Sequence, residues 1–253
     1  MKVPAKIKYK SIFISDTHLG TRGCKSTLLD NFLSFHDCEN LYLIGDIIDG
    51  WALHRRWYFP QTHVNVIHHI LKKAKEGTKV YWAIGNHDEF VRPFIKHSLN
   101  FGNVHIDNQF VYTGINGKKY LVIHGDLFDH FMKLGWLSHL GDWAYEILLI
   151  INDKFNWFRN LLGKDYWSLS LFLKHKVKEA VQFINKFEEH LRHYAEKRDY
   201  NGVICGHIHK PIIIEDTFTY MNTGDWVESC SALVEHLDGR WELIFWSKMN
   251  GKD

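Results

Sequence analysis

The sequence is poor in cysteine and has little excess charge. Its four cysteines (Cys24, Cys38, Cys205 and Cys230) are widely spaced among 253 residues and form no C-x-x-C pair. This usage is not that of a disulfide scaffold, so we expect reduced and mostly buried thiols. The 31 basic residues outnumber the 29 acidic ones by only two. Because a nucleic-acid-coating surface needs a strong basic excess, no nucleic-acid partner is expected.

Long apolar runs are also missing. The most apolar stretch, residues 134–151, is interrupted by His139, Asp142 and Glu146, whereas a spanning helix needs ~20 uninterrupted apolar residues. The basic N-terminal segment leads into a short strand-like run without an apolar signal-peptide core, so no signal peptide is expected. We therefore expect a cytoplasmic protein, and a peripheral position at the inner face of the membrane stays open.

What is present is an alternation of apolar strands and amphipathic helices. Residues 10–16, 41–44 and 79–84 have strand patterns, while helices are expected to begin at Ser26 and near Pro60. Farther along, Asn116-Gly117 and Asp238-Gly239 each separate two apolar runs, which predicts two β-hairpins. The expected fold class is therefore α/β with mixed sheets.

A helical segment interrupts this pattern. Residues 127–200 carry apolar side chains at helical spacing, and we find no internal repeat or low-complexity linker. We expect a single domain over residues 1–253, with a helical cap insertion at about 127–200.

Histidine is abundant, at 18 residues, and several histidines fall into a recurring pattern. Five segments couple the end of an apolar strand to a loop rich in Asp, Asn, His and Gly. Ligand sites of open α/β sheets collect beyond the carboxyl ends of strands. The segments are ISDTHLG (14–20), IGDIIDG (44–50), IGNHDE (84–89), VIHGDL (122–127) and CGHIHK (205–210).

These loops supply seven oxygen and imidazole donors and no thiolate: Asp16, His18, Asp46, Asn86, His124, His207 and His209. Such a set suits two divalent metals of intermediate hardness, such as Mn, Fe or Zn. A metal pair activates water and stabilises in-line displacement at phosphorus, which points to hydrolysis of a phosphate ester or pyrophosphate. One such segment alone is often a turn or a pair of loop histidines, but five together favour the metal site.

In this order the motifs D-x-H, G-D-x-x-D-G, G-N-H-D, H-G-D and G-H-x-H resemble those of calcineurin-like metallophosphoesterases, over about residues 10–225. The resemblance implies a four-layer αββα sandwich of two mixed sheets. It implies that Asp16, His18, Asp46 and His209 hold one metal and that Asn86, His124 and His207 hold the second, with Asp46 bridging the two.

The same resemblance implies roles for residues beside the ligands. His87 would be the catalytic hydrogen-bond donor or general acid, oriented by Asp88. Asp49 and Asp126 would fix the ligand imidazoles, although surface loop aspartates are the competing interpretation.

A narrower resemblance concerns the substrate. No arginine follows Asp49, unlike in Ser/Thr protein phosphatases of this family. The runs at 167–181 and 222–229 are similar to those of the UDP-2,3-diacylglucosamine pyrophosphatases of lipid A biosynthesis, which release UMP and the acylated sugar 1-phosphate. Because the best-known branch of that group has arginine where His87 stands, a nucleotide or general phosphodiesterase is the alternative. A non-catalytic metal-binding scaffold is a remote one.

The cap carries the remaining expectations. Ser170, Lys174 and Lys178 recur at i, i+4 and i+8, and the resemblance implies that they contact phosphate and sugar oxygens together with Asn86, His87 and His207. A solvated charged face would explain the same spacing. The aromatic residues of the cap suit an acyl-chain groove, a bilayer surface or simple packing. We expect two divalent metals, with Mn favoured.

Overall fold

The computed structural model describes residues 6–95, 102–131 and 169–247. The chain divides into two compact units, Met1–Asp126 with Leu191–Asp253, and Leu127–His190. The second unit lies largely outside the described residues, so the predicted cap insertion stays a prediction. Within the described residues, no helix is both long and apolar enough to span a membrane.

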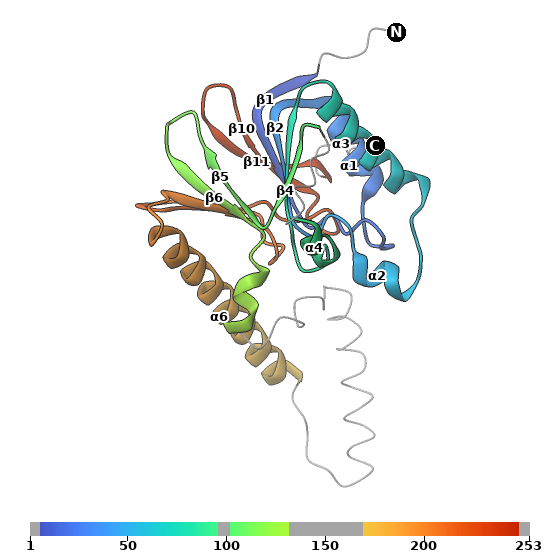
Figure 1. The fold of residues 1–253 in the computed structure, drawn as a ribbon. Coiled ribbons are helices and arrows are strands. Elements are labelled where there is room, and N and C mark those ends of the chain that lie inside the picture. Colours follow the sequence, from blue (N-terminus) through green and yellow to red (C-terminus); the bar gives the residue numbers. More distant parts are fainter. Residues whose placement is uncertain (1–5, 96–101, 132–168, 248–253) are drawn as a thin grey trace, which may run out of the picture. The chain divides into compact units, whose positions relative to one another are not determined.

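The first sheet of the larger unit has six strands in the order β11-β10-β1-β2-β3-β4 (Figure 1). Strands β1 to β4 run parallel, whereas β10 pairs antiparallel with both β1 and β11. The β10–β11 hairpin lies where Asp238-Gly239 predicts it. The bounds are β1 Ile7–Ile14, β2 His36–Ile44, β3 Lys79–Ala83, β4 Val104–Asp107, β10 Ser231–Glu235 and β11 Trp241–Phe245.

The second sheet has five strands in the order β5-β6-β7-β9-β8. Strands β6, β7 and β9 are parallel, and the edge strands β5 and β8 are antiparallel to their neighbours. The predicted hairpin at Asn116-Gly117 joins β5 to β6. The bounds are β5 Gln109–Thr113, β6 Lys119–Ile123, β7 Gly202–Cys205, β8 Ile212–Glu215 and β9 Thr219–Asn222. The predicted fold of two mixed sheets with helices is confirmed.

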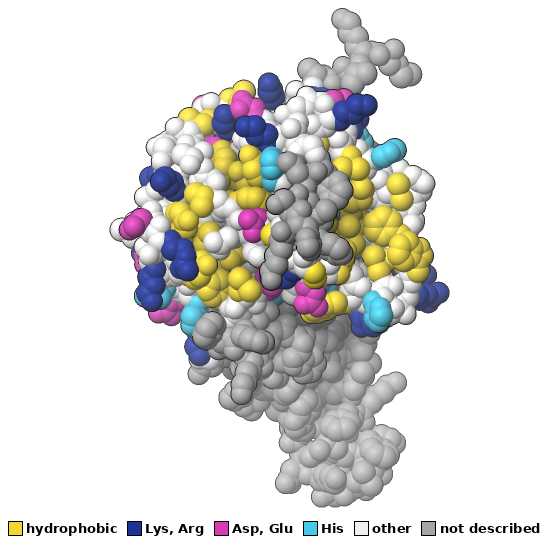
Figure 2. All heavy atoms as spheres, viewed as in Figure 1, with side chains coloured by type: hydrophobic (Ala, Val, Ile, Leu, Met, Phe, Trp, Pro, Cys, Tyr) yellow, Lys and Arg dark blue, Asp and Glu magenta, His cyan; other side chains and the backbone are white. Residues whose placement is uncertain are grey.

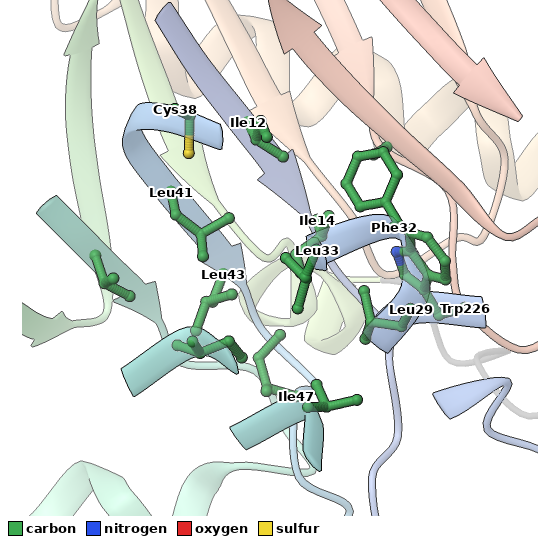
Figure 3. Packing of buried hydrophobic residues seen from close by; sticks show 14 of the residues in the cluster. Ile12, Ile14, Leu29, Phe32, Leu33, Cys38, Leu41, Leu43, Ile47 and Trp226 are labelled. Atoms are coloured by element: carbon green, nitrogen blue, oxygen red, sulfur yellow. The ribbon is translucent and has the colours of Figure 1, made fainter. Parts of the chain in front are cut away.

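Helices α1 and α3 cover the outer face of the first sheet. In Figure 3 the buried Leu33 of α1 lies beside Ile14 of β1, and the buried Leu29 and Phe32 lie beside Trp226. The four cysteines are free and buried, as predicted. The helical bounds are α1 Ser26–Phe35, α2 Gly50–Arg55, α3 Gln61–Lys75, α4 Arg92–Ile95 and α6 Leu169–Glu196, with 3-10 turns η1 Glu89–Val91 and η2 Asp126–Phe131.

The inner faces of the two sheets share an aromatic core that contains one polar link. Phe13 stacks on Tyr42 at 4.8 Å and meets Tyr112 of the second sheet edge-on at 5.1 Å. The buried hydroxyl of Tyr112 donates to the carboxylate of Glu235 and accepts from Ser11 Oγ at 2.8 Å. Burial and the Glu235 charge raise the pKa of Tyr112, so its hydroxyl stays protonated and donates.

The topology determines where the functional loops lie. Besides β4, the parallel parts of the two sheets contain six strands, namely β1, β2 and β3 of the first sheet and β6, β7 and β9 of the second. In Figure 1 the carboxyl ends of β1 and β2 point the same way as that of β6. Ligands bind at such carboxyl ends, so the six loops that follow these strands are available to build one site.

We expect Tyr112→Phe to destabilise the protein by about 1–3 kcal/mol, because it removes the donor to a buried carboxylate while keeping the ring. Urea unfolding measures the free energy of unfolding. Tyr81→Phe is the matched control, since Tyr81 lies at the edge of the same core with a partly exposed ring. Equal effects of the two changes would contradict a stabilising role for the Tyr112–Glu235 link.

Candidate metal centre

Five of the seven predicted ligands have a left-handed backbone. Asp16, His18, Asp46, His207 and His209 have φ angles between 48° and 70°. Such a conformation is sterically unfavourable for residues with a Cβ and costs of order 1–3 kcal/mol each. Backbone strain of this kind concentrates at functional sites, where the surrounding structure holds it in place. Here each strained residue lies just beyond the end of a parallel strand.

The structure brings six of the seven predicted ligands into two neighbouring groups of facing donor atoms. Asp16, His18 and His209 form the first, with His209 Nε2 at 3.2 Å from Asp16 Oδ1. Asp46, His124 and His207 form the second. In each group the donor atoms lie within 4.8 Å of one another, so each group can hold one ion. A third possible group, His18, Asp49 and His87, shares His18 with the first.

Asp46 lies between the two groups. Its Oδ1 accepts a hydrogen bond of 2.9 Å from the His87 backbone N–H. Its Oδ2 lies 3.4 Å from His124 Nε2 in the second group and 3.8 Å from His18 Nε2 in the first. One oxygen is thus fixed by the backbone, and the other faces imidazoles of both groups. This is the arrangement that a bridging carboxylate requires.

Several of the donor atoms make no hydrogen bond within the site and are suited to binding divalent metals. Asp16 Oδ1, His18 Nε2, Asn86 Oδ1 and His124 Nε2 are buried and have no hydrogen-bond partner among the described residues. Buried polar atoms are nearly always satisfied, so these four atoms are suited to binding a metal ion or another ligand. Metal–ligand bonds of about 2.0–2.2 Å place two ligands of one metal roughly 3–3.5 Å apart, close to the separations found here.

Backbone hydrogen bonding directs the buried His124 ring toward the centre. Its Nδ1 lies 2.9 Å from the carbonyl oxygen of Ile44, the last residue of β2. An Nδ1–H donated to that carbonyl turns Nε2 toward Asp46. The ring is therefore oriented by the first sheet although His124 follows a strand of the second.

The buried carboxylates of the centre favour positive charge around them. Burial disfavours ionisation of Asp16, yet the neighbouring imidazoles of His209 and His124 hold the pKa of Asp16 well below its usual range. Burial likewise opposes protonation of His209, but the Asp16 carboxylate raises the pKa of His209 to about 9. The pKa of His124 is raised well above its usual value by Asp46 and Asp16, against the effect of burial. Bound metal ions would supply this positive charge instead.

Glycines let the strand ends approach this closely. A Cβ at Gly85 would collide with Asp46 Oδ1 and would lie 2.8 Å from Cδ2 of His124. A Cβ at Gly206 would collide with Asp16 Oδ2 and Ser15 Oγ. Both glycines therefore leave room for a carboxylate from another strand, which explains their place in the motifs.

Asp49 contacts two imidazoles and begins a helix. Its Oδ2 lies 3.3 Å from His18 Nδ1 and 3.0 Å from His87 Nδ1, while its Oδ1 accepts from the Ala52 N–H at 2.7 Å and caps α2. Burial opposes its ionisation, but His18 and His87 lower the pKa of Asp49 below its usual range. Asp49 thus faces one nitrogen of each of these two imidazoles.

Asp88 was expected to orient His87, and Asp126 to orient a ligand imidazole, but in the structure both carboxylates bind other partners. The Asp88 carboxylate accepts from the backbone N–H groups of Ile47 and Ile48, at 3.0 and 2.7 Å, and so anchors the loop after β2. Burial and the charge of Asp46 raise the pKa of Asp88 to about 6. The carboxylate that faces Nδ1 of His87 belongs to Asp49.

Asp126 forms an ion pair with Arg92 at 2.6 Å. The same guanidinium group reaches the carbonyl oxygen of Gly85 at 3.4 Å and Asn108 Oδ1 at 3.0 Å. Asp126 therefore steadies the loop after β3 through Arg92, while the ring of His124 is oriented by Ile44.

The loop after β9 supports the centre and is missing from the five sequence motifs. Ser15 Oγ lies within hydrogen-bond distance of Asp16 Oδ2, of Thr223 Oγ1 (2.6 Å) and of the Gly224 carbonyl (2.9 Å). Asn222 Nδ2 donates to the Gly206 carbonyl at 2.7 Å. The signal was available, because the apolar strand TYM runs into the polar loop NTGD as in the other five segments.

The predicted substrate contacts divide into two sets. Asn86, His87 and His207 lie at the centre. Ser170, Lys174 and Lys178 belong to α6, but their side chains lie outside the described residues, so their role stays a prediction.

The family model for calcineurin-like phosphoesterases matches residues 9–211. The chain therefore belongs to the calcineurin-like phosphoesterase family and is a metal-dependent phosphoester hydrolase of that class. No curated protein matches the sequence significantly.

Three solved structures resemble the chain at low identity. A predicted phosphoesterase from Streptococcus pneumoniae TIGR4 is 14% identical, with a TM-score of 0.35 and coverage of 93% of this chain and 97% of that one. A Vps29 variant from Entamoeba histolytica is 14% identical (TM-score 0.41, coverage 92% and 97%). Vps29 from Cryptosporidium parvum is 13% identical (TM-score 0.41, coverage 92% and 94%).

We expect Gly85→Ala to weaken metal binding about 10–100-fold or more, because the new methyl group displaces Asp46 and His124. Metal analysis after dialysis against limiting Mn²⁺ measures the loss. Gly23→Ala is the control, since its Cβ would meet only Val227 Cγ1, at 3.3 Å, and the side chain of Thr21. Full metal content in the Gly85 variant would contradict the close packing of this loop.

Proposed function

We propose that the protein hydrolyses a phosphodiester or pyrophosphate bond with two divalent metals, of which Mn²⁺ is favoured. The observation that carries this proposal is the position of Asp46 Oδ2 between imidazoles of two ligand groups. When bound, the metal pair would supply an activated water molecule and offset the charge that develops on the phosphate oxygens. The mixed oxygen and nitrogen donors suit Mn, Fe or Zn.

His87 is proposed as the donor to the leaving group. Its Nε2 lies 3.9 Å from Asp46 Oδ2, its Nδ1 faces Asp49, and its ring is only partly buried. Burial opposes protonation, yet Asp49 and Asp46 raise the pKa of His87 above its ordinary value. A protonated imidazole at the edge of the centre can donate a hydrogen bond or a proton to the oxygen that leaves phosphorus.

For the substrate we propose a UDP-linked acylated sugar, UDP-2,3-diacylglucosamine, cleaved to UMP and the acylated sugar 1-phosphate. The support comes from the sequence, in the runs 167–181 and 222–229 and in the absence of arginine after Asp49. The second of these runs contacts the loop of Asp16, because the backbone N–H of Trp226 donates to the Asp16 carbonyl at 3.1 Å. A cap contact with acyl chains or with the membrane surface belongs to the same proposal.

Removal of the metals should abolish turnover, and Mn²⁺ should restore it. We expect about two metal ions per chain by elemental analysis. Asp46→Asn should reduce this content and lower turnover by at least about 100-fold, since it removes the charge proposed to be shared by both ions. The exposed Asp216→Asn is the control. Unchanged metal content in the Asp46 variant would argue against the bridging role.

The substrate proposal predicts a preference for acylated over deacylated UDP-sugars. Each buried methylene group contributes ~0.8 kcal/mol, so we expect kcat/KM to be at least about tenfold higher for UDP-2,3-diacylglucosamine. Release of UMP, followed chromatographically, measures both rates. Equal rates would favour a nucleotide or general phosphodiesterase of the same family.

A further inference from the structure

A series of hydrogen bonds connects the loop after β2 to the loop after β3. The Gly50 N–H donates to the His87 carbonyl at 3.0 Å, next to the hydrogen bonds that Asp46 and Asp88 accept across the same two loops. The outermost link is between side chains, where Trp51 Nε1–H donates to Glu89 Oε1 at 2.9 Å. Trp51 and Glu89 therefore continue the row of hydrogen bonds that begins at the metal centre.

Trp51 also contacts the proposed donor directly. Its ring centroid lies 4.3 Å from that of His87, with the planes inclined by 40°. The His18 ring meets His87 edge-on at 4.7 Å, and Asp49 faces its Nδ1. The imidazole is thus held by contacts with a metal ligand, a carboxylate and an indole. His18 is a proposed metal ligand and Asp49 faces His18, whereas Trp51 has neither role.

Stability of the core does not explain this tryptophan. Its side chain is 44% exposed, and Glu89 is exposed as well. Figure 2 shows hydrophobic side chains gathered on the side of the molecule where Figure 1 places α2 and α3. Single exposed aromatic residues are common, but Trp51 is fixed at both ends. Its backbone lies in the first turn of α2, which Asp49 caps, and its indole N–H is bound by Glu89.

We propose that Trp51, held by Glu89, is a positioning residue that aims the His87 imidazole at the leaving oxygen. This inference rests on the proposed function for its chemical step. In that step the oxygen of water forms a bond to phosphorus while the bond to the leaving oxygen breaks. The electron pair stays on the leaving oxygen, the proton on His87 Nε2 moves to it, and one proton of the attacking water is released to solvent. A misdirected imidazole slows this transfer most when the leaving oxygen is strongly basic.

The first experiment compares Mn²⁺-loaded Trp51→Ala, Trp51→Phe and Glu89→Ala on aryl phosphodiesters with 4-nitrophenyl or phenyl leaving groups. General acid catalysis contributes about 10²–10⁴-fold, so we expect Trp51→Ala to lower kcat about 10–100-fold for the phenyl ester. The loss for the 4-nitrophenyl ester should be less than about threefold, because that leaving group needs little protonation. KM and metal content should not change.

The variants also test whether Trp51 affects turnover through His87. Trp51→Phe keeps a ring against His87 and should retain more activity than Trp51→Ala. In a His87→Ala background, Trp51→Ala should change kcat by less than about twofold, because residues that act through one another are not additive. Trp57→Ala is the matched control, as Trp57 is 76% exposed in the link after α2. Equal losses for both leaving groups, or a raised KM at unchanged kcat, would overturn the positioning role.

A second measurement is independent of turnover. The imidazole C–H signals of His87, assigned in NMR spectra by their loss in His87→Ala, should carry the ring-current shift of the nearby indole. Both Trp51→Ala and Glu89→Ala should move these signals, while Trp57→Ala should not. If the His87 signals do not move in Glu89→Ala, the positioning role of Trp51 and Glu89 is wrong, even if the protein hydrolyses phosphodiesters. Moved signals in a protein without Mn²⁺-dependent hydrolysis would support the positioning contact and reject the proposed function.

Discussion

The centre depends on the burial of two carboxylates side by side. Asp16 is 0% exposed and Asp46 is 3% exposed, and burying an ion costs several kcal/mol unless opposite charge compensates it. Imidazoles surround both carboxylates, and their raised pKa values show how strongly the carboxylates attract positive charge. A pair of divalent cations would neutralise this charge and leave the imidazoles neutral, as ligands must be. The fold therefore buries two negative charges that bound metal ions would neutralise.

The fold supports this arrangement by confining strain to loop residues. The strands that end at the centre are regular and buried, whereas the left-handed residues follow them within a few positions. Rigid strand ends hold conformations that a flexible loop would relax. Close packing adds a second constraint, because Gly85 and Gly206 let carboxylates that follow other strands approach the backbone. Preorganised ligands then bind metal without the entropic cost of ordering a loop.

Much of the fold and the grouping of six of the seven proposed ligands could be predicted from the sequence, because each of them follows an apolar strand in a short local motif. The supporting contacts could not. Ser15 contacts Thr223 across 208 positions in sequence, and nothing local to either residue signals the other. Asp88 and Asp126 lie in the right motifs, yet their partners are set by loop geometry. Both bind donors other than the imidazoles, namely the Ile47–Ile48 backbone and Arg92. Helix α2 was likewise unpredicted, since six residues carry too little periodicity.

Asp49 connects these levels of structure. It caps α2, faces the ligand His18 and faces the proposed donor His87. Since one carboxylate makes all three contacts, the orientation of a metal ligand, the orientation of the donor and the start of a helix are coupled. A change in any of them alters the hydrogen-bonding geometry of the others, because buried polar networks are not additive. The motif G-D-x-x-D-G therefore encodes more than ligands. Its second aspartate ties the metal centre to α2, and α2 in turn carries the indole that touches His87.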